Sequence, residues 1–425
     1  MLRRFFLLGL VLSSALVDVL GNVSTGAISV NGILTILFAA GIFLFLLRRP
    51  KRAWRGFIRI WPLSGLFIFT VLQCLRQRPS MQGFQNVLLL WIFIGCIVLV
   101  LVEGENELDA TQLVHALLTA TAIAAFGYGV SLIYGGLGTE SFIGARSFAL
   151  YSMLGIGLLL GRWVHGSRIS LWLAVALLLL IALSLSRTCL VVGVLLFPLA
   201  RMRSFSVRDI SRIVIIGAIG AGALYYSVMS IDALRVRFLG NNSVMDFVTG
   251  DASLDTSGRL AAWILTLDSF SESPWLGKGP GTANDLNGVA FADRRGDSQV
   301  ELAHPLNEYL RFLHDEGVLG LSLVLAGYAQ LLLLCRKAYR KSTEVASPAA
   351  SFYLGTFLAF TAVLLTMLTD NTASYTYVVI PLGILIGITL HTMNRLTLET
   401  SESRARTVRA VRPSALGTLT SDSQT

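Results

Sequence analysis

Charged residues are scarce in this chain and make up only 14% of its 425 residues. Soluble globular proteins carry roughly 25% charged residues, and the mean hydropathy here is +0.69. These values exclude an ordinary soluble enzyme, a disordered protein and a nucleic-acid-binding domain with a basic surface. They are typical of a chain that lies in a lipid bilayer along most of its length.

Signatures of metal or nucleotide binding are also missing. The four cysteines fall in or at the ends of apolar segments and show neither metal-ligand spacing nor a disulfide framework. The glycine-rich stretch 277–282 lacks the spacing of a P-loop, and no strand precedes it. We interpret this stretch as a tight turn, with a phosphate-binding nest of backbone N–H groups as the alternative.

Apolar runs dominate what is present. A membrane-spanning helix needs about 20 mostly apolar residues, and the sequence predicts an all-α polytopic membrane protein with about twelve such helices. The apolar segments are 5–20, 28–47, 60–75, 84–102, 112–134, 148–163, 170–186, 188–200, 213–231, 318–334, 349–369 and 375–392. The first resembles a signal peptide without a cleavage site, so we expect it to be retained. The short segments 170–186 and 188–200 form either one broken span or two separate spans.

The basic residues are distributed unequally between the two sides of the predicted bundle. With the N-terminus in the cytoplasm, 23 of the 34 Lys and Arg residues fall on the cytoplasmic side. Seven of the others lie in one long outer loop, and long loops hardly count in the positive-inside rule. We therefore expect both termini in the cytoplasm, and the net charge of +9 indicates topology rather than nucleic-acid binding.

Hydropathy and charge divide the chain into four parts. Residues 1–231 form an N-terminal bundle of about nine spans, 232–317 a large outer loop, and 318–395 about three further spans. The tail 396–425 is rich in Ser, Thr and Arg, a composition typical of disorder. The outer loop holds thirteen acidic and seven basic residues, so its surface as a whole does not favour polyanions.

The first of two helices predicted in the outer loop covers 258–270. Apolar residues recur there with helical spacing, and Ser257 is the expected N-cap. Arg259 falls in the first turn, where the helix dipole disfavours a cation. A bound anion and an ion pair with Asp255 are equally good explanations for it.

The second predicted helix covers 305–316 and is amphipathic. Its spacing places His304, Asn307, Arg311 and His314 on one face, opposite an apolar stripe. We expect an interfacial helix at the outer membrane surface with this polar face in water.

Two further arginines stand out because of their surroundings. Arg187 lies between two apolar runs, with no other charged residue within ten positions on either side. A charge at or near membrane depth is expensive and usually faces a cavity or a partner. Arg187 is therefore a candidate functional residue, and Arg146 in the outer loop 143–147 is a weaker candidate of the same kind.

Three motifs in this order resemble the O-antigen ligase and O-antigen or exopolysaccharide polymerase family of bacterial inner membranes. They are Ser-Leu-Ser-Arg-Thr at 184–188, the segment 259–281 with its Pro-Trp-Leu-Gly-Lys-Gly-Pro-Gly end, and Asn-Glu-Tyr-Leu-Arg at 307–311 followed by Gly-Val-Leu-Gly. The match covers about 130 residues, from 184 to 320. A twelve-span layout with one large periplasmic loop agrees with it.

The resemblance implies a multi-pass inner-membrane protein that transfers a glycan from undecaprenyl diphosphate to an acceptor hydroxyl on the periplasmic side. Ligases use the lipid A core as acceptor, and polymerases use another lipid-linked repeat. The expected partners are these substrates, membrane lipids and a chain-length regulator or export complex, but no nucleic acid. No cofactor and no metal are implied. The motif at 307–311 is more similar to that of exopolysaccharide polymerases, so a polymerase is slightly favoured.

The resemblance also suggests roles for individual residues. Members carry a histidine directly before the asparagine of the third motif, but Leu306 occupies that position here. His304 either replaces the missing base or this member relies less on histidine. The candidate catalytic residues are Arg187 and Arg259, which would bind the diphosphate, and His304, which would activate the acceptor; the candidate substrate-binding residues are Arg146, Asn307 and Arg311.

Two other classes of function are also compatible with the sequence. Twelve spans also suit a transporter or flippase, but carriers usually place ionisable residues or broken helices near the bilayer midplane. The predicted spans are almost free of charge, and the polar residues collect on one outer face. A structural scaffold of an export complex is the third option, and it leaves the isolated Arg187 unexplained.

Overall fold

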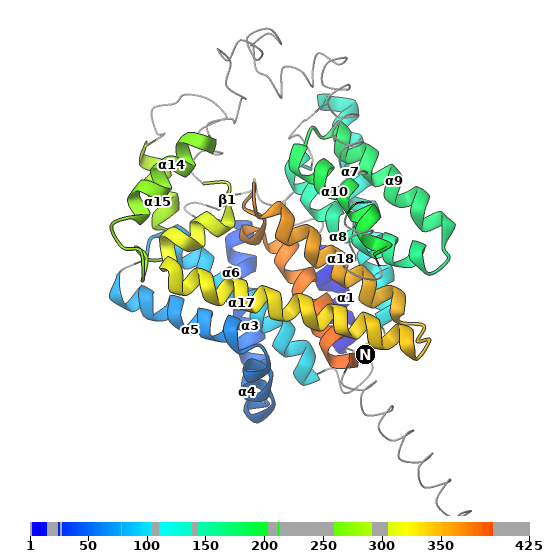
Figure 1. Cartoon of the computed structure of the whole chain (residues 1–425), viewed down its shortest axis with the longest axis horizontal. Coiled ribbons are helices and arrows are strands. Elements are labelled where there is room, and N and C mark those ends of the chain that lie inside the picture. Colours follow the sequence, from blue (N-terminus) through cyan, green and yellow to red (C-terminus); the bar gives the residue numbers. More distant parts are fainter. Residues whose placement is uncertain are drawn as a thin grey trace, which may run out of the picture.

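The computed structural model describes residues 2–14, 24–25, 28–77, 79–103, 110–137, 143–202, 211, 259–290 and 305–393. Apart from the two-residue strands β1 (Ser24–Thr25) and β2 (Ile28–Ser29), which pair antiparallel, its regular elements are helices (Figure 1). The predicted all-α class is thereby confirmed for this part of the chain.

Most of the helices follow the apolar segments of the sequence. They are α1 (Leu2–Ser14), α3 (Val30–Leu47), α4 (Pro50–Arg59), α5 (Trp61–Arg76), α6 (Met81–Glu103), α7 (Ala110–Gly135), α8 (Ala145–Val164), α9 (Arg168–Leu183), α10 (Arg187–Ala200), α14 (Arg259–Phe270), α15 (Thr282–Ala290), α17 (Glu308–Glu344) and α18 (Ala350–Thr366), followed by the 3-10 turn η1 (Thr372–Ser374) and a last helix, Thr376–Met393. The predicted span 213–231 lies outside the described residues.

Five of the described helices are long and apolar enough to cross a membrane, namely α6, α7, α8, α17 and Thr376–Met393. A sixth candidate is the pair formed by α3 and α4, which is bent by 111°. Helices α5, α9, α10 and α18 are apolar but shorter. The count of twelve spans and the four-part division of the chain therefore stay predictions, and the tail 396–425 lies outside the described residues.

Helices α8 and α18 pack backbone to backbone in the interior. A Cβ atom at Gly157 of α8 would lie 2.6 Å from the backbone nitrogen of Ala359, and one at Gly161 would collide with the carbonyl oxygen of Ser351. Small residues at a helix interface allow this close approach, as is common between membrane helices. This close contact fixes α8 against α18 along much of its length.

The short connection between α9 and α10 is a sharp turn. Leu185 has a positive φ of 58°, and the hydroxyl of Ser184 accepts a hydrogen bond from the backbone N–H of Ser186 at 3.4 Å. The apolar run 170–200 is therefore two helices rather than one, and Arg187 is the first residue of the second.

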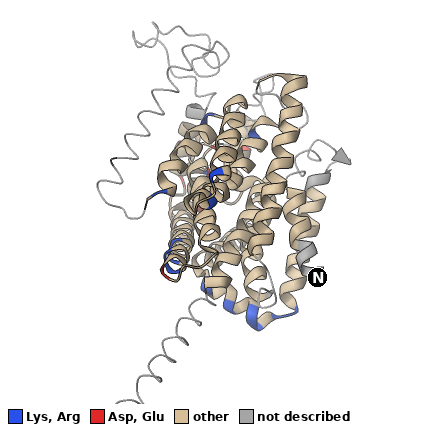
Figure 2. Cartoon of the chain, turned by 90° about the vertical axis from the view of Figure 1, so that its right-hand side faces the viewer, with Lys and Arg blue, Asp and Glu red and all other residues tan. Residues whose placement is uncertain are grey.

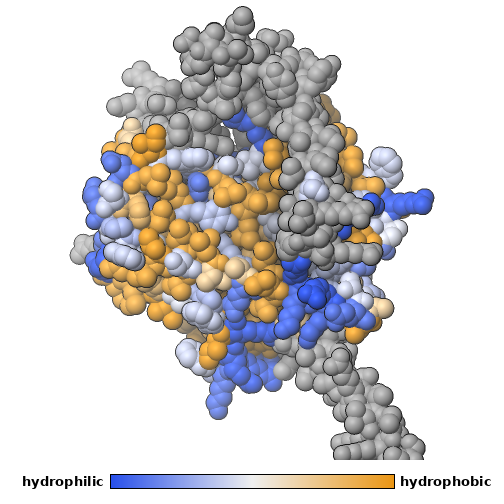
Figure 3. All heavy atoms as spheres, in the orientation of Figure 1, coloured by the Kyte–Doolittle hydropathy of each residue, from blue (hydrophilic) through white to orange (hydrophobic). Residues whose placement is uncertain are grey.

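Basic residues gather toward one end of the described helices (Figure 2). Helix α4 contributes Lys51, Arg52, Arg55 and Arg59 to this end, while its residues Ala53 and Gly56 are buried. In the space-filling view, apolar side chains cover much of the visible face and hydrophilic ones lie along its lower edge (Figure 3). This distribution is the one expected of a membrane protein whose basic end faces the cytoplasm.

Candidate functional site

Helix α17 is two helices joined at a kink. Asn307 is its N-cap, and the Oδ1 atom of Asn307 accepts a hydrogen bond from the backbone N–H of Leu310 at 3.0 Å. Gly317 interrupts the helix with a φ of 68°, and a side chain there would collide with the carbonyl oxygen of Trp275. The predicted start at Pro305 was wrong, because the Asn307 cap delays the helix to Glu308.

The segment 308–316 before the kink is buried, although its sequence is highly charged. Its buried polar residues are Glu308, Arg311, His314, Asp315 and Glu316, each no more than 5% exposed. The prediction that this helix shows its polar face to water was wrong. The reason is that the loop 274–283 and the segment after α18 both cover that face.

Arg311 is held inside this segment by carboxylates. Its Nε atom donates to Oε2 of Glu308 at 2.7 Å, and its Nη2 atom lies 2.6 Å from the same oxygen. The other oxygen of Glu308 accepts a hydrogen bond from the hydroxyl of Ser374 at 2.8 Å. A second carboxylate, that of Asp315, lies 3.8 Å from Nη1 of Arg311. Glu308 thus links the start of α17 to η1, and Arg311 pairs with the same carboxylate.

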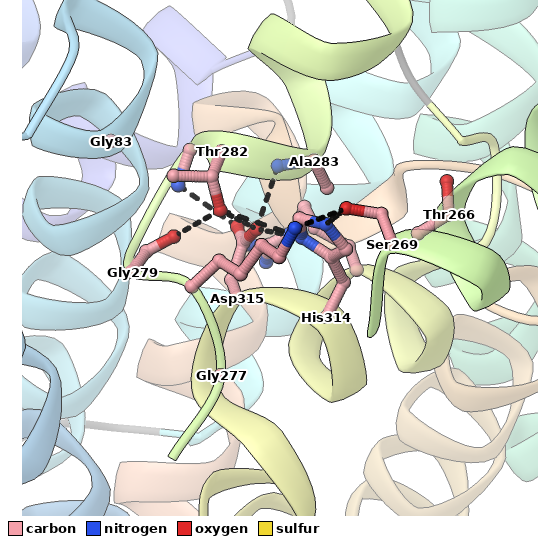
Figure 4. Close-up of polar contacts among 12 residues, drawn as sticks. Gly83, Thr266, Ser269, Gly277, Gly279, Thr282, Ala283, His314 and Asp315 are labelled. Carbon is pink, nitrogen blue, oxygen red and sulfur yellow. Dashed lines mark hydrogen bonds and ion pairs between the residues drawn. The ribbon is translucent and has the colours of Figure 1, made fainter. Parts of the chain in front are cut away.

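The Asp315 carboxylate binds the glycine-rich loop to the kink (Figure 4). One of its oxygens accepts hydrogen bonds from the backbone N–H of Ala283 at 2.8 Å and the hydroxyl of Thr282 at 3.1 Å. The other oxygen accepts the backbone N–H of Gly281 at 2.9 Å. Asp315 therefore caps the N-terminus of α15 from a distant position in the sequence.

The stretch 277–282 is a tight turn. Gly277, Gly279 and Gly281 have φ values of 72°, 102° and 85°, which side chains rarely tolerate. The backbone N–H of Gly279 donates to the carbonyl oxygen of Asp315 at 2.8 Å. Since the N–H of Gly281 binds the Asp315 carboxylate, the nest considered above is occupied by a carboxylate of the chain itself.

His314 connects this loop to α14. Its Nδ1 atom lies 3.1 Å from Oδ1 of Asp315, and its Nε2 atom lies 3.0 Å from the hydroxyl oxygen of Ser269. The ammonium group of Lys278 donates to Ser269 at 2.9 Å and to Glu272 at 2.8 Å. The hydrogen bond and the charge of Lys278 lower the pKa of Glu272. Figure 4 shows His314 between Ser269 and Asp315, and these contacts hold α14, the loop and α17 together.

A second cluster surrounds the end of α18. Nε of Arg146 lies 3.1 Å from both oxygens of Asp370, and Nη2 donates to Oδ1 at 2.7 Å. The Asp370 side chain is 7% exposed, and that of Arg146 is 25% exposed. The Arg146 guanidinium also lies 5.7 Å from the ring centre of Tyr375, which stacks on Tyr377.

Thr188, the residue after Arg187, connects the start of α10 to this second cluster. The hydroxyl oxygens of Thr188 and Thr369 are 2.6 Å apart, and Thr369 directly precedes Asp370. The backbone N–H of Glu308 donates to the carbonyl oxygen of Met367 at 3.0 Å. The segment 367–375 therefore contacts the starts of α8, α10 and α17, each of which carries a predicted site residue.

The structure describes the side chains of four of the six predicted site residues. Arg146, Asn307 and Arg311 have the partners given above, and Arg187 is half-buried at the start of α10. Arg259 is the first residue of α14, but its side chain lies outside the described part, as does all of His304. The roles of all six stay predictions.

Asp370 is the residue that the sequence analysis missed. It is the only Asp, Glu, Lys or Arg between positions 345 and 394. The argument used for Arg187, that an isolated charge near membrane depth needs a partner, would have identified it. In the described part of the chain, no group of three or more His, Cys, Asp or Glu side chains could hold a metal ion.

Part of the chain matches a known protein family. Residues 172–325 match the family described as O-antigen ligase. The matched range contains α10 with Arg187, helices α14 and α15, and the kink of α17. The predicted resemblance to this family is thereby confirmed over residues 172–325. No curated protein shows significant sequence similarity to the chain.

Proposed function

The chain carries an O-antigen ligase domain, and on this premise we propose that it transfers a glycan from undecaprenyl diphosphate to an acceptor hydroxyl at the periplasmic face of a bacterial inner membrane. The domain itself indicates glycosyl transfer of the O-antigen assembly type. The lipid carrier, the membrane face and the cytoplasmic position of both termini are parts of the proposal.

One observation supports the proposal most. The segment 367–375 holds the start of α8 through Arg146, the start of α10 through Thr188, and the start of α17 through Glu308. Helices that are far apart in the sequence therefore present their polar ends at one place. A lipid-linked donor needs such a site at the end of a membrane bundle, where a polar headgroup can meet fixed charges while its chain stays in the bilayer.

In the proposed reaction the acceptor hydroxyl attacks the anomeric carbon, and the glycosidic bond to the diphosphate breaks. The diphosphate gains negative charge as it leaves, so the site needs fixed cations. Arginine stays protonated and binds phosphate bidentately. We assign this role to Arg187 and Arg259. Attack from the face opposite the diphosphate would invert the anomeric centre.

Arg146 has a supporting role in this proposal. Its Nε and Nη2 atoms are engaged by Asp370, while a quarter of its side chain is exposed. The pair fixes the guanidinium in place, so that its remaining edge can face the donor phosphate without a loss of side-chain freedom on binding. Asp370 is then a positioning residue.

The third motif supplies the acceptor side of the site. His304 precedes α17 by four residues and is the proposed base, because a neutral histidine can accept the proton of a hydroxyl group. Asn307 caps α17 and Arg311 is buried in pairs with carboxylates. These contacts support a role for both residues in holding the motif in position beside the substrate.

The proposed acceptor is another lipid-linked repeat, which would make the protein a polymerase. The reason is the similarity of the motif at 307–311 to that of exopolysaccharide polymerases. Purified protein should convert a lipid-linked repeat into a ladder of longer products. One-step transfer to lipid A core would instead identify a ligase, and movement of lipid or solute without a new glycosidic bond would indicate a transporter.

The role of the arginines is tested by replacement. We expect Arg187→Ala and Arg259→Ala each to abolish the polymer while the amount of protein in the membrane is unchanged. Arg168→Ala is the matched control, because Arg168 is an exposed arginine at the start of another helix and should retain full activity. Wild-type polymer from Arg187→Ala would refute the assignment.

A further inference from the structure

A pocket of about 400 Å³ lies between the start of α7, the end of α8 and the start of α18. Its residue Arg162 is 16 positions after Arg146 on the same helix, or about 24 Å away at 1.5 Å per residue. The pocket is therefore separate from the candidate glycosyl-transfer site. It lies at the opposite end of α8, which the distribution of basic residues assigns to the cytoplasmic side.

The polar wall of this pocket carries two basic side chains. Arg162 and His115 line it together with the small polar residue Ser351. Within the part of the chain that the structure describes, neither basic side chain forms a hydrogen bond or an ion pair. Arg146, at the other end of the helix, has a bidentate carboxylate partner instead.

The position of Arg162 is fixed by helix packing. The preceding residue, Gly161, lies so close to Ser351 and Gly355 of α18 that a side chain there would collide with backbone atoms of both. Arg162 is therefore held beside the first turn of α18, and His115 lies in the second turn of α7. The N-termini of these two helices carry partial positive charge, which adds to the charge of the arginine.

The other wall of the pocket is apolar, with Leu158 and Phe352 among its residues. A free polar anion would leave this wall exposed to water. An anion joined to a short apolar group would satisfy both walls at once. The volume lies within the range of roughly 300–1,000 Å³ that is usual for sites of small ligands.

We propose that this pocket binds the phosphate headgroup of an anionic phospholipid from the cytoplasmic leaflet. Arg162 and His115 contact the phosphate, and Leu158 and Phe352 contact the glycerol and the first methylene groups of the chains. The inference goes beyond glycosyl transfer and does not depend on it, because the pocket is at the other end of the bundle.

The test is a binding measurement on the purified full-length protein in a neutral detergent, with short-chain phosphatidylglycerol as the probe. Arg162→Gln should weaken binding at least tenfold, which corresponds to about 1.4 kcal/mol, and His115→Gln should weaken it less. Arg162→Lys keeps the charge and should retain most of the affinity. Arg168→Gln removes an exposed arginine that does not line the pocket, so it should bind like the wild type.

Two further probes distinguish an anionic lipid headgroup from a neutral lipid and from free phosphate. Short-chain phosphatidylcholine, which has no net charge, should bind at least tenfold more weakly than phosphatidylglycerol. Inorganic phosphate alone should also bind more weakly, because it leaves the apolar wall uncovered. Equal binding of the two lipids, equal binding of inorganic phosphate, or unchanged affinity in a folded Arg162→Gln protein would each overturn the proposal.

Discussion

Replacement of Asp315 by Asn tests how the glycine-rich loop is held. The change keeps the shape of the side chain but converts one carboxylate oxygen into an NH₂ group. Both oxygens accept hydrogen bonds, one from Ala283 and Thr282 and the other from Gly281. Whichever way the amide is turned, its NH₂ group faces at least one buried N–H donor.

The magnitude follows from these contacts. A buried donor left without a partner costs about 1–3 kcal/mol, and loss of a charged N-cap costs about 1 kcal/mol. The change also relieves repulsion between Asp315 and Glu316, which are adjacent and both buried. We therefore expect the free energy of local opening of the loop and α15 to be about 2–3 kcal/mol lower in Asp315→Asn than in the wild type.

The rate of amide hydrogen exchange, measured by mass spectrometry, reports this free energy of opening. Each 1.4 kcal/mol corresponds to about a tenfold change, so amides between 274 and 290 should exchange roughly 30–150 times faster in Asp315→Asn. Asp285→Asn is the matched control, because Asp285 is an exposed acid in the first turn of the same helix. If the two variants exchanged at the same rate in this segment, the capping role of Asp315 would be refuted.

Three further predictions concern the helix ends and the kink. Arg146→Gln leaves Asp370 buried without its partner, so thermal stability should fall by the equivalent of about 3 kcal/mol, and the double variant with Asp370→Asn should recover part of the loss. Gly317→Ala should lower the unfolding temperature, because φ is 68° and no room exists for a side chain. Gly288→Ala, on an open face of α15, should be neutral or stabilising. Trp263→Phe removes the 2.6 Å hydrogen bond from Nε1 of Trp263 in α14 to the carbonyl oxygen of Pro305, and limited proteolysis should then cut α14 faster.

The helical class of the fold could be predicted from the sequence because a membrane constrains it so strongly. Backbone groups in a bilayer must bond internally, so a long apolar run is almost always a helix. Helix limits were harder to predict where polar side chains set them. Asn307 is the N-cap of α17, whereas the sequence favoured Pro305 because proline is common at the first position of a helix.

The burial of the charged segment 308–316 could not be predicted from its own pattern. Periodicity shows which residues share a face, but what covers that face depends on distant parts of the chain. Here the cover is the loop 274–283, which is fixed by Asp315, and η1, which is fixed by Glu308. Both contacts join residues more than thirty positions apart.

The candidate site was predicted in part. Arg187, which is isolated in the sequence, and Arg146 were both predicted as candidates, and both lie at the starts of helices that the segment 367–375 contacts. Asp370 was missed because an acidic residue between two apolar segments does not show in the sequence which distant cation it pairs with. Its carboxylate nevertheless supplies the ion-pair partner of Arg146.

The central claim is that Arg187 serves glycosyl transfer from a lipid-linked donor. Its most direct test is the reaction of purified protein with a lipid-linked repeat, with products separated by gel electrophoresis. The wild type should form longer lipid-linked glycans, and Arg187→Ala should form them roughly 100–1,000 times more slowly, as expected for loss of a preorganised charge donor. An equal rate in the two proteins, or no new glycosidic bond in either, would contradict the account.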